Sequence, residues 1–292
     1  MRALLLLLSV AAGFRTGLLD HLAPCDAAQD PRTLAELGDF YKPSKFGWHR
    51  VPGGPRSTPD AYRGKVFSHT DYAFLYAPYL EEYRTKRFRL LELGIDTGAS
   101  LDVWRAYFPC AESHGVDLDP PERAFSATLH RGDLSDAAWL ETFAASAGAF
   151  DVVIDDASHA VGDQLLAFDR LFLGAVAPGG LYAIEDIETS YWTRLNNEKE
   201  GTYGYSLRNE TSIVEHFKLV ADAVNREFRW GGGGGRSPLP AVYDSVSTVT
   251  FAQNLIILRK QLPGEGKYSD RKYHLYDEAH CPRRETDCRR RA

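Results

Sequence analysis

Acidic residues cluster in two short stretches of the chain, DDASH at Asp155–His159 and ED at Glu185–Asp186. Each stretch ends an apolar run typical of a buried strand, at 150–156 and 180–187. If both strands belong to one parallel sheet, their carboxyl ends meet at one edge and the four carboxylates face a common crevice. Neighbouring carboxylates repel, and Mg²⁺ or Mn²⁺, which prefer oxygen ligands, would relieve that repulsion. We therefore predict a metal site, with His159 placed as a base rather than as the main ligand.

The same residues also have a purely structural interpretation. Asp156 and Glu185 would cap the helices that follow them, and His159 would be a turn histidine with its hydrogen bonds satisfied. The residues alone leave both interpretations open.

A second group of candidates follows the earlier strands. The stretch Glu92–Ser100 reads ELGIDTGAS and opens directly into a helical pattern. Glycine at 94 and 98 lets the backbone approach a ligand closely, and the G-x-x-x-G spacing favours a cofactor without phosphates over a dinucleotide. Asp117 and Asp133 end the next two strands, where carboxylates can accept ribose hydroxyls and an adenine amino group. Acids at strand ends also form caps and turns, but a glycine loop and two acids in order at three successive strand ends favour a binding site.

An α/β fold would bring these positions together. Short apolar runs alternate with helical patterns from residue 89 to 260, which is typical of a doubly wound, mostly parallel, Rossmann-like sheet. We expect seven strands, including 89–95, 113–118, 127–133, 150–156 and 180–187. A C-terminal antiparallel hairpin, 245–251 and 254–260, would turn near Gln253–Asn254 at the sheet edge. Helices are expected at 100–107, 136–145, 162–176 and 212–228.

The chain divides into four expected parts. Residues 1–28 are a signal peptide and leader, 29–88 an irregular, partly helical layer over the carboxyl edge, which faces the substrate, 89–262 the α/β domain, and 263–292 a tail. The aromatic residues of the 29–88 layer are expected mainly to pack. Gly231–Gly235 is expected to form a mobile surface loop.

Composition excludes several classes of protein. The 292 residues are 44% hydrophobic and 25% charged, as in ordinary globular proteins. The net charge of −6 lacks the positive field that attracts nucleic acid, so we expect no nucleic-acid partner. The apolar run Ala3–Ala12 is too short to cross a bilayer.

That apolar run favours the secretory pathway, either the lumen or secretion. The alternatives are a docked apolar helix or a short signal anchor, and the chain would be cytoplasmic if the run is not a signal peptide. A sequon at Asn209 and a cysteine pair, Cys281 and Cys288, spaced to close a small disulfide loop, lean the same way.

Five stretches carry a resemblance to a known family: HTDYAFLY (69–76), LELGIDTGASLDVWRAYFP (91–109), IDDASH (154–159), PGGLYAIEDIETSYW (178–192) and FAQNLIILRK (251–260). The sequence resembles the class I S-adenosylmethionine-dependent methyltransferases. More narrowly, it is similar to the metal-dependent sugar O-methyltransferases of macrolide biosynthesis, the mycinamicin and macrocin group.

The resemblance implies a role for each matching residue. Seven residues would bind S-adenosylmethionine: Glu92, Gly94, Gly98, Ser100, Asp117, Asp133 and Asp155. Asp156, Glu185 and Asp186 would hold Mg²⁺ or Mn²⁺, and His159 would remove a proton from a hydroxyl of a small-molecule or glycan acceptor. Ala157 departs from the family pattern, which usually has glycine there, and this would tighten the turn if the position needs a positive φ.

Two further functions compete with this one. A S-adenosylmethionine- or carbohydrate-binding module that has lost catalysis would not need the intact acids and histidine. A nicotinamide-dependent oxidoreductase is disfavoured by the missing G-x-G-x-x-G. The acceptor and the oligomeric state, a homo-oligomer included, stay open.

Overall fold

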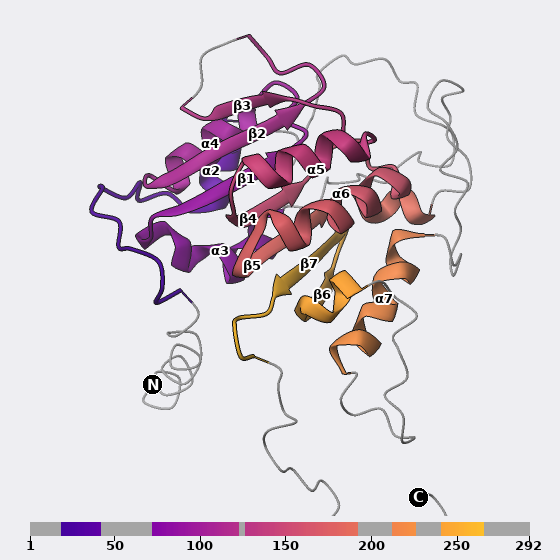
Figure 1. Cartoon of the computed structure of the whole chain (residues 1–292). Helices are drawn as coiled ribbons and strands as arrows, with labels where there is room; N and C mark the ends of the chain where they lie inside the picture. Colours follow the sequence, from indigo (N-terminus) through magenta and orange to yellow (C-terminus); the bar gives the residue numbers. More distant parts are fainter. Residues whose placement is uncertain (1–18, 42–71, 123–125, 192–211, 226–240, 266–292) are drawn as a thin grey trace, which may run out of the picture.

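The computed structural model describes residues 19–41, 72–122, 126–191, 212–225 and 241–265 (Figure 1). Its centre is one sheet of seven strands: β1 (Phe88–Leu93), β2 (Ala111–Asp117), β3 (Thr128–Arg131), β4 (Phe150–Asp155), β5 (Val176–Glu185), β6 (Val246–Ala252) and β7 (Leu255–Lys260). Their order is β3-β2-β1-β4-β5-β7-β6. All neighbours from β3 to β5 are parallel, and β7 pairs antiparallel with both β5 and β6. The expected fold, with its C-terminal hairpin, is confirmed.

Helices cover both faces of the sheet (Figure 1). One face carries α5 (Ala137–Ser146), α6 (Val161–Gly174) and α7 (Ile213–Val224), and the other carries α2 (Leu34–Tyr41), α3 (Tyr72–Leu80) and α4 (Ala99–Tyr107). Three short 3-10 helices complete the described elements: η3 (Glu81–Thr85), η4 (Ile187–Tyr191) and η6 (Ala241–Ser245). Among the described helices, none is long and apolar enough to cross a membrane.

The central strands carry apolar residues on both faces because both faces are covered. In β4, Val153 faces the core beneath α5, α6 and α7, whereas Val152 and Ile154 face the core beneath α2, α3 and α4. All three are at most 1% exposed. Because β4 is packed on both faces, the position of its last residue, Asp155, at the edge of the sheet is fixed.

Strand register aligns the candidate residues at one edge. Leu93 of β1 pairs with Asp155 of β4, which pairs with Ile184 of β5. The residues that follow these positions therefore leave the sheet side by side. This alignment brings Gly94, Asp156 and Glu185 to the same carboxyl edge.

Local capping sets where the flanking helices begin. The carboxylate of Asp136 accepts hydrogen bonds from the N–H groups of Ala138 and Trp139, at 2.9 and 3.2 Å, and starts α5. Ser212 accepts one from the Glu215 N–H at 3.1 Å and starts α7, as expected from the sequence. The expected end of α6 at Val176 was wrong, because Val176 already pairs with Phe150 as the first residue of β5.

The described N-terminal residues are tied to the sheet domain. A disulfide joins Cys25 to Cys110, the residue before β2. The Cys25 N–H also donates to the Thr85 carbonyl at 2.8 Å, and the Arg87 N–H to the Ala23 carbonyl at 2.7 Å. The α2 and α3 helices pack over one face of the sheet, and α3 also reaches its carboxyl edge through Tyr72 and Tyr76.

Several predictions concern residues outside the described ranges. These are the apolar N-terminal run, the sequon at Asn209, the glycine stretch at 231–235 and the pair Cys281 and Cys288.

Candidate active site

A pocket of about 420 Å³ lies at the carboxyl edge, among the loops that follow β1 to β4. Its volume is within the range of small-molecule sites, roughly 300–1,000 Å³. The walls include Gly94, Asp117, Asp133 and Asp156, one residue from each of the four loops. The predicted cofactor loop and one predicted metal ligand therefore share one pocket.

Gly94 is needed where the loop after β1 touches the loop after β4. Its φ is +78°, and a Cβ there would overlap the Asp156 carbonyl oxygen and the Cα of Ala157. Gly98 also has a positive φ, +75°, and is the N-cap of α4. Ala157 is not among the residues with positive φ, so its replacement of glycine introduces no backbone strain of this kind.

Asp117 and Asp133 line the pocket and also order their own loops. Asp117 accepts hydrogen bonds from the N–H groups of Ile95, at 3.0 Å, and Asp119, at 2.9 Å. Asp133 accepts from both the N–H and the hydroxyl of Ser135, which lowers the pKa of its carboxyl. Asp117 and Asp133 therefore both stabilise their own turns and line the pocket.

The other predicted cofactor residues lie behind the pocket wall. Glu92 is fully buried and accepts a 2.7 Å hydrogen bond from the Ser100 hydroxyl, which ties β1 to the start of α4. Asp155 is 1% exposed and accepts a hydrogen bond from the Tyr182 hydroxyl at 3.2 Å. Burial raises the pKa of the Asp155 carboxyl to about 7. These residues support the loops from behind.

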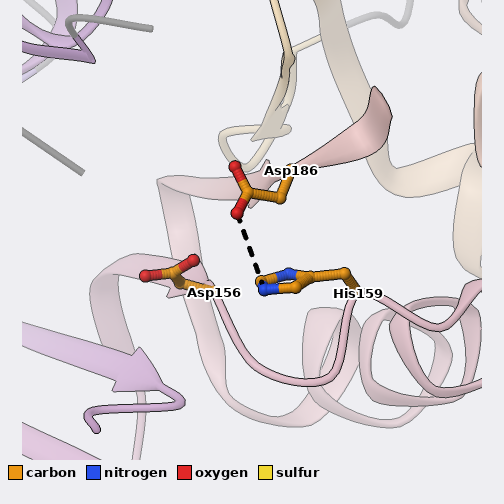
Figure 2. A group of neighbouring side chains, drawn as sticks. All are labelled: Asp156, His159 and Asp186. Atoms are coloured by element: carbon orange, nitrogen blue, oxygen red, sulfur yellow. Dashed lines mark ion pairs between the residues drawn. The ribbon is translucent and has the colours of Figure 1, made fainter. Parts of the chain in front are cut away.

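The side chains of Asp156, His159 and Asp186 lie close together beyond the carboxyl ends of β4 and β5 (Figure 2). Each offers a ligand atom, and the three atoms lie within 4.8 Å of one another; they are the one such group among the described residues. His159 Nε2 lies 3.6 Å from Asp186 Oδ2. His159 and Asp186 have φ values of +56° and +52°, conformations that are costly for residues other than glycine and that often occur at functional sites.

Glu185 lies beside this group but is not part of it. Its side chain is fully buried, and one carboxylate oxygen accepts a 2.7 Å hydrogen bond from the Tyr76 hydroxyl. The amide of Gln164 donates to the Glu185 carbonyl at 3.1 Å. The structure therefore brings two of the three predicted metal ligands together with the predicted base and holds the third one layer deeper.

The capping interpretation does not describe Asp156. The N-cap of α6 is Ala160, and no side chain caps that helix end. The loop is held instead by Ser158, whose hydroxyl donates to Asp163 at 2.6 Å and accepts from the Ala160 N–H at 3.2 Å. The Asp156 carboxylate is directed toward the pocket and the cluster.

The segment after β5, which forms η4, contacts the loop that carries His159. The Thr189 hydroxyl donates to the His159 carbonyl at 3.1 Å, so the loops after β4 and β5 are joined. Burial raises the pKa of the Glu188 carboxyl, and the nearby negative charge of Asp186 raises it further. Tyr191 is 47% exposed, and Trp192 lies outside the described residues.

Two contacts to Asp186 were not foreseen from the sequence. The Tyr72 hydroxyl and the Asn254 side-chain amide both donate to Asp186 Oδ1, at 2.7 and 3.0 Å. Tyr72 belongs to a run of aromatics that predicts packing, and Asn254 to a turn. The sequence carries no signal that pairs residues 114 and 68 positions apart.

The cluster fits a divalent cation. Two carboxylates and an imidazole lie close enough to share one ion, and carboxylate oxygens suit Mg²⁺ or Mn²⁺. His159 Nδ1 is buried and has no hydrogen-bond partner among the described atoms, so this ring nitrogen is not committed to the local fold.

Comparisons with known proteins found methyltransferases of similar sequence and fold. No protein-family model matches the chain. An 8-demethyl-8-(2-methoxy-alpha-L-rhamnosyl)-tetracenomycin-C 3'-O-methyltransferase from Streptomyces olivaceus is 41% identical over 126 residues, 40% of this chain and 32% of the relative. The demethylmacrocin O-methyltransferase of Streptomyces fradiae is 35% identical over 200 residues, 65% of this chain and 49% of the relative.

A solved structure covers more of the chain. The mycinamycin-pathway methyltransferase MycE, in complex with Mg and SAH, superposes with a TM-score of 0.65 and 26% identity, over 82% of this chain and 57% of MycE. The chain is therefore similar to sugar O-methyltransferases that act in the mycinamicin, macrocin and tetracenomycin series. Its sheet domain has the class I methyltransferase fold. The chain spans at most half the length of the curated relatives it matches.

Proposed function

We propose that the chain transfers a methyl group from S-adenosylmethionine (SAM) to a hydroxyl of a sugar or another polyhydroxylated small molecule. One observation carries the proposal: Asp156 belongs both to the pocket expected to hold SAM and to the cluster expected to hold a divalent cation. The names of the relatives and the Mg and SAH of MycE support it.

The pocket residues would hold and orient SAM. Gly94 lets the loop after β1 pack directly against the loop after β4 at the pocket wall. Asp117 would accept the ribose hydroxyls, and Asp133 the adenine amino group. The buried Glu92 and Asp155 hold the loops in place. Because the SAM sulfonium already activates its methyl group, the main task of the protein is to align the acceptor oxygen with the methyl carbon.

The cluster residues would prepare the acceptor. Asp156 and Asp186 would hold the cation, with Glu185 available from the layer beneath. A divalent cation bound there supplies Lewis-acid polarisation of an acceptor hydroxyl. His159 Nε2, facing Asp186, would take the hydroxyl proton as the oxygen–carbon bond forms and the carbon–sulfur bond breaks, leaving S-adenosylhomocysteine.

Calorimetric titration of SAM and, separately, of Mn²⁺ into the purified chain tests the proposal. We expect the wild type to bind both, and Asp156→Asn to lose the metal event while keeping SAM. Turnover of a vicinal-diol sugar acceptor should stop in EDTA and return with Mg²⁺. An absence of SAM binding would overturn the methyltransferase proposal. Binding of both ligands without turnover of any polyhydroxylated acceptor would favour an inactive binding module.

We also propose that the chain folds in an oxidising compartment of the secretory pathway. The Cys25–Cys110 disulfide supports this, because such bonds persist mainly outside the reducing cytosol. Non-reducing peptide mapping of the protein from its native source should recover the Cys25–Cys110 peptide. Recovery of both cysteines as free thiols would contradict the proposal.

A further inference from the structure

Asn254, in the turn between β6 and β7, stands out among polar residues that the proposed mechanism does not use. It lies far from the cluster in sequence, yet it contacts Asp186 through its side chain. We propose that Asn254, together with Tyr72, is a positioning residue that fixes the Asp186 carboxylate for metal binding. The inference rests on the proposed function.

The register between β5 and β7 places Asn254 beside Asp186. Glu185, the last residue of β5, pairs with Leu255, the first residue of β7, in an antiparallel ladder. Because the two strands run in opposite directions, Asp186, which follows Glu185, and Asn254, which precedes Leu255, leave the sheet at the same edge. The hairpin turn is therefore held against the metal ligand by the sheet itself.

Asn254 binds three separate groups around Asp186. Its amide nitrogen donates to Asp186 Oδ1 at 3.0 Å, and its amide oxygen accepts from the Glu188 N–H at 2.7 Å. Its backbone carbonyl lies 3.1 Å from the Tyr72 hydroxyl, which lies 2.7 Å from the same Oδ1. The Asp186 N–H donates back to the Tyr72 oxygen at 3.1 Å.

In this network the two oxygens of the Asp186 carboxylate have different contacts. Oδ1 is held by two neutral donors, whereas Oδ2 faces His159 Nε2. The two neutral donors fix the rotation of the carboxylate without placing a competing positive charge beside it. Ligand carboxylates in metal sites are commonly oriented by such outer hydrogen bonds.

The backbone of Asn254 supports a dedicated role. Its φ is +60°, in the left-handed region that glycine occupies most readily and asparagine tolerates best among other residues. Glycine would satisfy the turn alone. Only a side chain with both a donor and an acceptor also joins Asp186 to Glu188.

The turn offers a matched pair of variants. Asn254→Gly removes the side-chain contacts and keeps a residue that accepts the positive φ, and Gln253→Gly makes the same change at the exposed neighbouring position. Tyr72→Phe removes the second donor to Oδ1. Each full-length variant would be titrated with Mn²⁺ and with SAM by calorimetry, and its melting temperature and metal-dependent turnover recorded.

We expect Asn254→Gly to weaken Mn²⁺ binding by about 10- to 100-fold, the usual effect of removing an outer hydrogen bond. SAM affinity and melting temperature should stay close to wild type, and high metal concentration should restore turnover. Tyr72→Phe should weaken Mn²⁺ binding in the same direction, and the double variant should lose less than the product of the single effects, because both donors act on one oxygen. Gln253→Gly should behave as wild type.

Two results would overturn the inference. One is Mn²⁺ affinity in Asn254→Gly within twofold of wild type. The other is an equal loss of SAM affinity or a lower melting temperature, which would assign Asn254 to the fold. If the wild type itself bound no Mn²⁺, the metal-dependent function would fail first, and this inference with it.

Discussion

Individual side chains at the site are held in costly conformations by their neighbours. Four described residues other than glycine have positive φ, and three of them, His159, Asp186 and Asn254, surround the cluster. Each such conformation costs on the order of 1–3 kcal/mol and persists only where surrounding contacts impose it. Thr189, Tyr72 and the paired strands supply those contacts.

Replacement of His159 separates a base from a ligand. We expect His159→Gln to lower kcat by roughly 10²- to 10⁴-fold, the usual contribution of a general base. Mn²⁺ affinity should change little if the imidazole only accepts a proton, whereas Asp156→Asn should lose the metal. Single-turnover kinetics and Mn²⁺ titration of both variants check this. A parallel loss of metal affinity in His159→Gln would make the histidine a ligand.

Gly94 provides a second test at the residue scale. In Gly94→Ala the added Cβ would overlap the backbone of Asp156, and the φ of +78° would be strained. We expect weaker SAM binding and a stability loss of about 1–3 kcal/mol, measured by calorimetry and urea unfolding. Gly162→Ala is the matched control, since a Cβ there meets nothing within 4 Å. Equal effects at both positions would contradict the close-approach argument.

At the scale of elements, α6 links the site to the main core. Its first turn follows the DDASH loop, and its buried face carries Phe168, which packs against Phe172, Tyr182, Phe217 and Tyr243. The same helix therefore anchors the loop that carries Asp156 and the aromatic cluster beneath β5.

Truncation within this cluster should be costly. Phe168→Ala is expected to lower the free energy of unfolding by about 3–5 kcal/mol, because the cavity cannot collapse among packed rings. Leu173→Ala, on the same helix but 52% exposed, should cost far less. Urea unfolding followed by circular dichroism compares the two. A similar loss in both variants would show that α6 contributes little through its buried face.

Elements were predictable from the sequence because their patterns are local. The apolar run of β4 and the capping residue Ser212 each mark an element within a few positions. The carboxyl-edge location of Asp156 and Asp186 follows from parallel strands. The Asn254 and Tyr72 contacts do not, since they depend on which strand lies beside β5 and on its register. Likewise, nothing local distinguishes Glu185, directed inward, from Asp186.

At the scale of the whole molecule, the Cys25–Cys110 bond joins the described N-terminal segment, residues 19–41, to the sheet domain across 85 residues of sequence. The local sequence could not pair these cysteines, because the pairing follows from the packing of the N-terminal segment beside η3. Closing a loop of this length restricts the unfolded chain more than the folded one.

Loss of the disulfide should therefore destabilise the protein. We expect Cys110→Ser to lower the free energy of unfolding by roughly 2–4 kcal/mol. Cys25→Ser and the double variant should show the same loss, because each removes the one bond. Thermal unfolding with and without reductant measures it. Additive losses in the double variant would mean that the two cysteines act separately.

The stability of the whole fold should depend on pH through the partly buried histidine His130. Burial and the neighbouring His114 lower the pKa of His130, so the folded state binds fewer protons than the unfolded state, where histidine titrates near 6.5. The stability from His130 is present above about pH 6.5 and is lost as the pH falls through its folded pKa.

Burial raises the pKa of Asp155 to about 7, so protonation of Asp155 stabilises the folded state as the pH falls, whereas protonation of His130 destabilises it. The effect of His130 is therefore measured as a difference between a His130 variant and wild type. The unfolding free energy of His130→Gln minus that of wild type should rise as the pH falls from about 7 to 5. Urea unfolding across this range measures the difference. A constant difference would show that His130 titrates alike in both states.

The position of β7 between β5 and β6 has a consequence during synthesis. A ribosome makes β5 long before β7, so the nascent chain carries one apolar edge of β5 without its partner until residues 255–260 emerge. Unpaired edges of this kind attract other chains. The last strands of the domain thus do more than finish the sheet: their arrival ends the interval in which β5 can aggregate, and it is also the moment at which Asp186 gains its contact with Asn254.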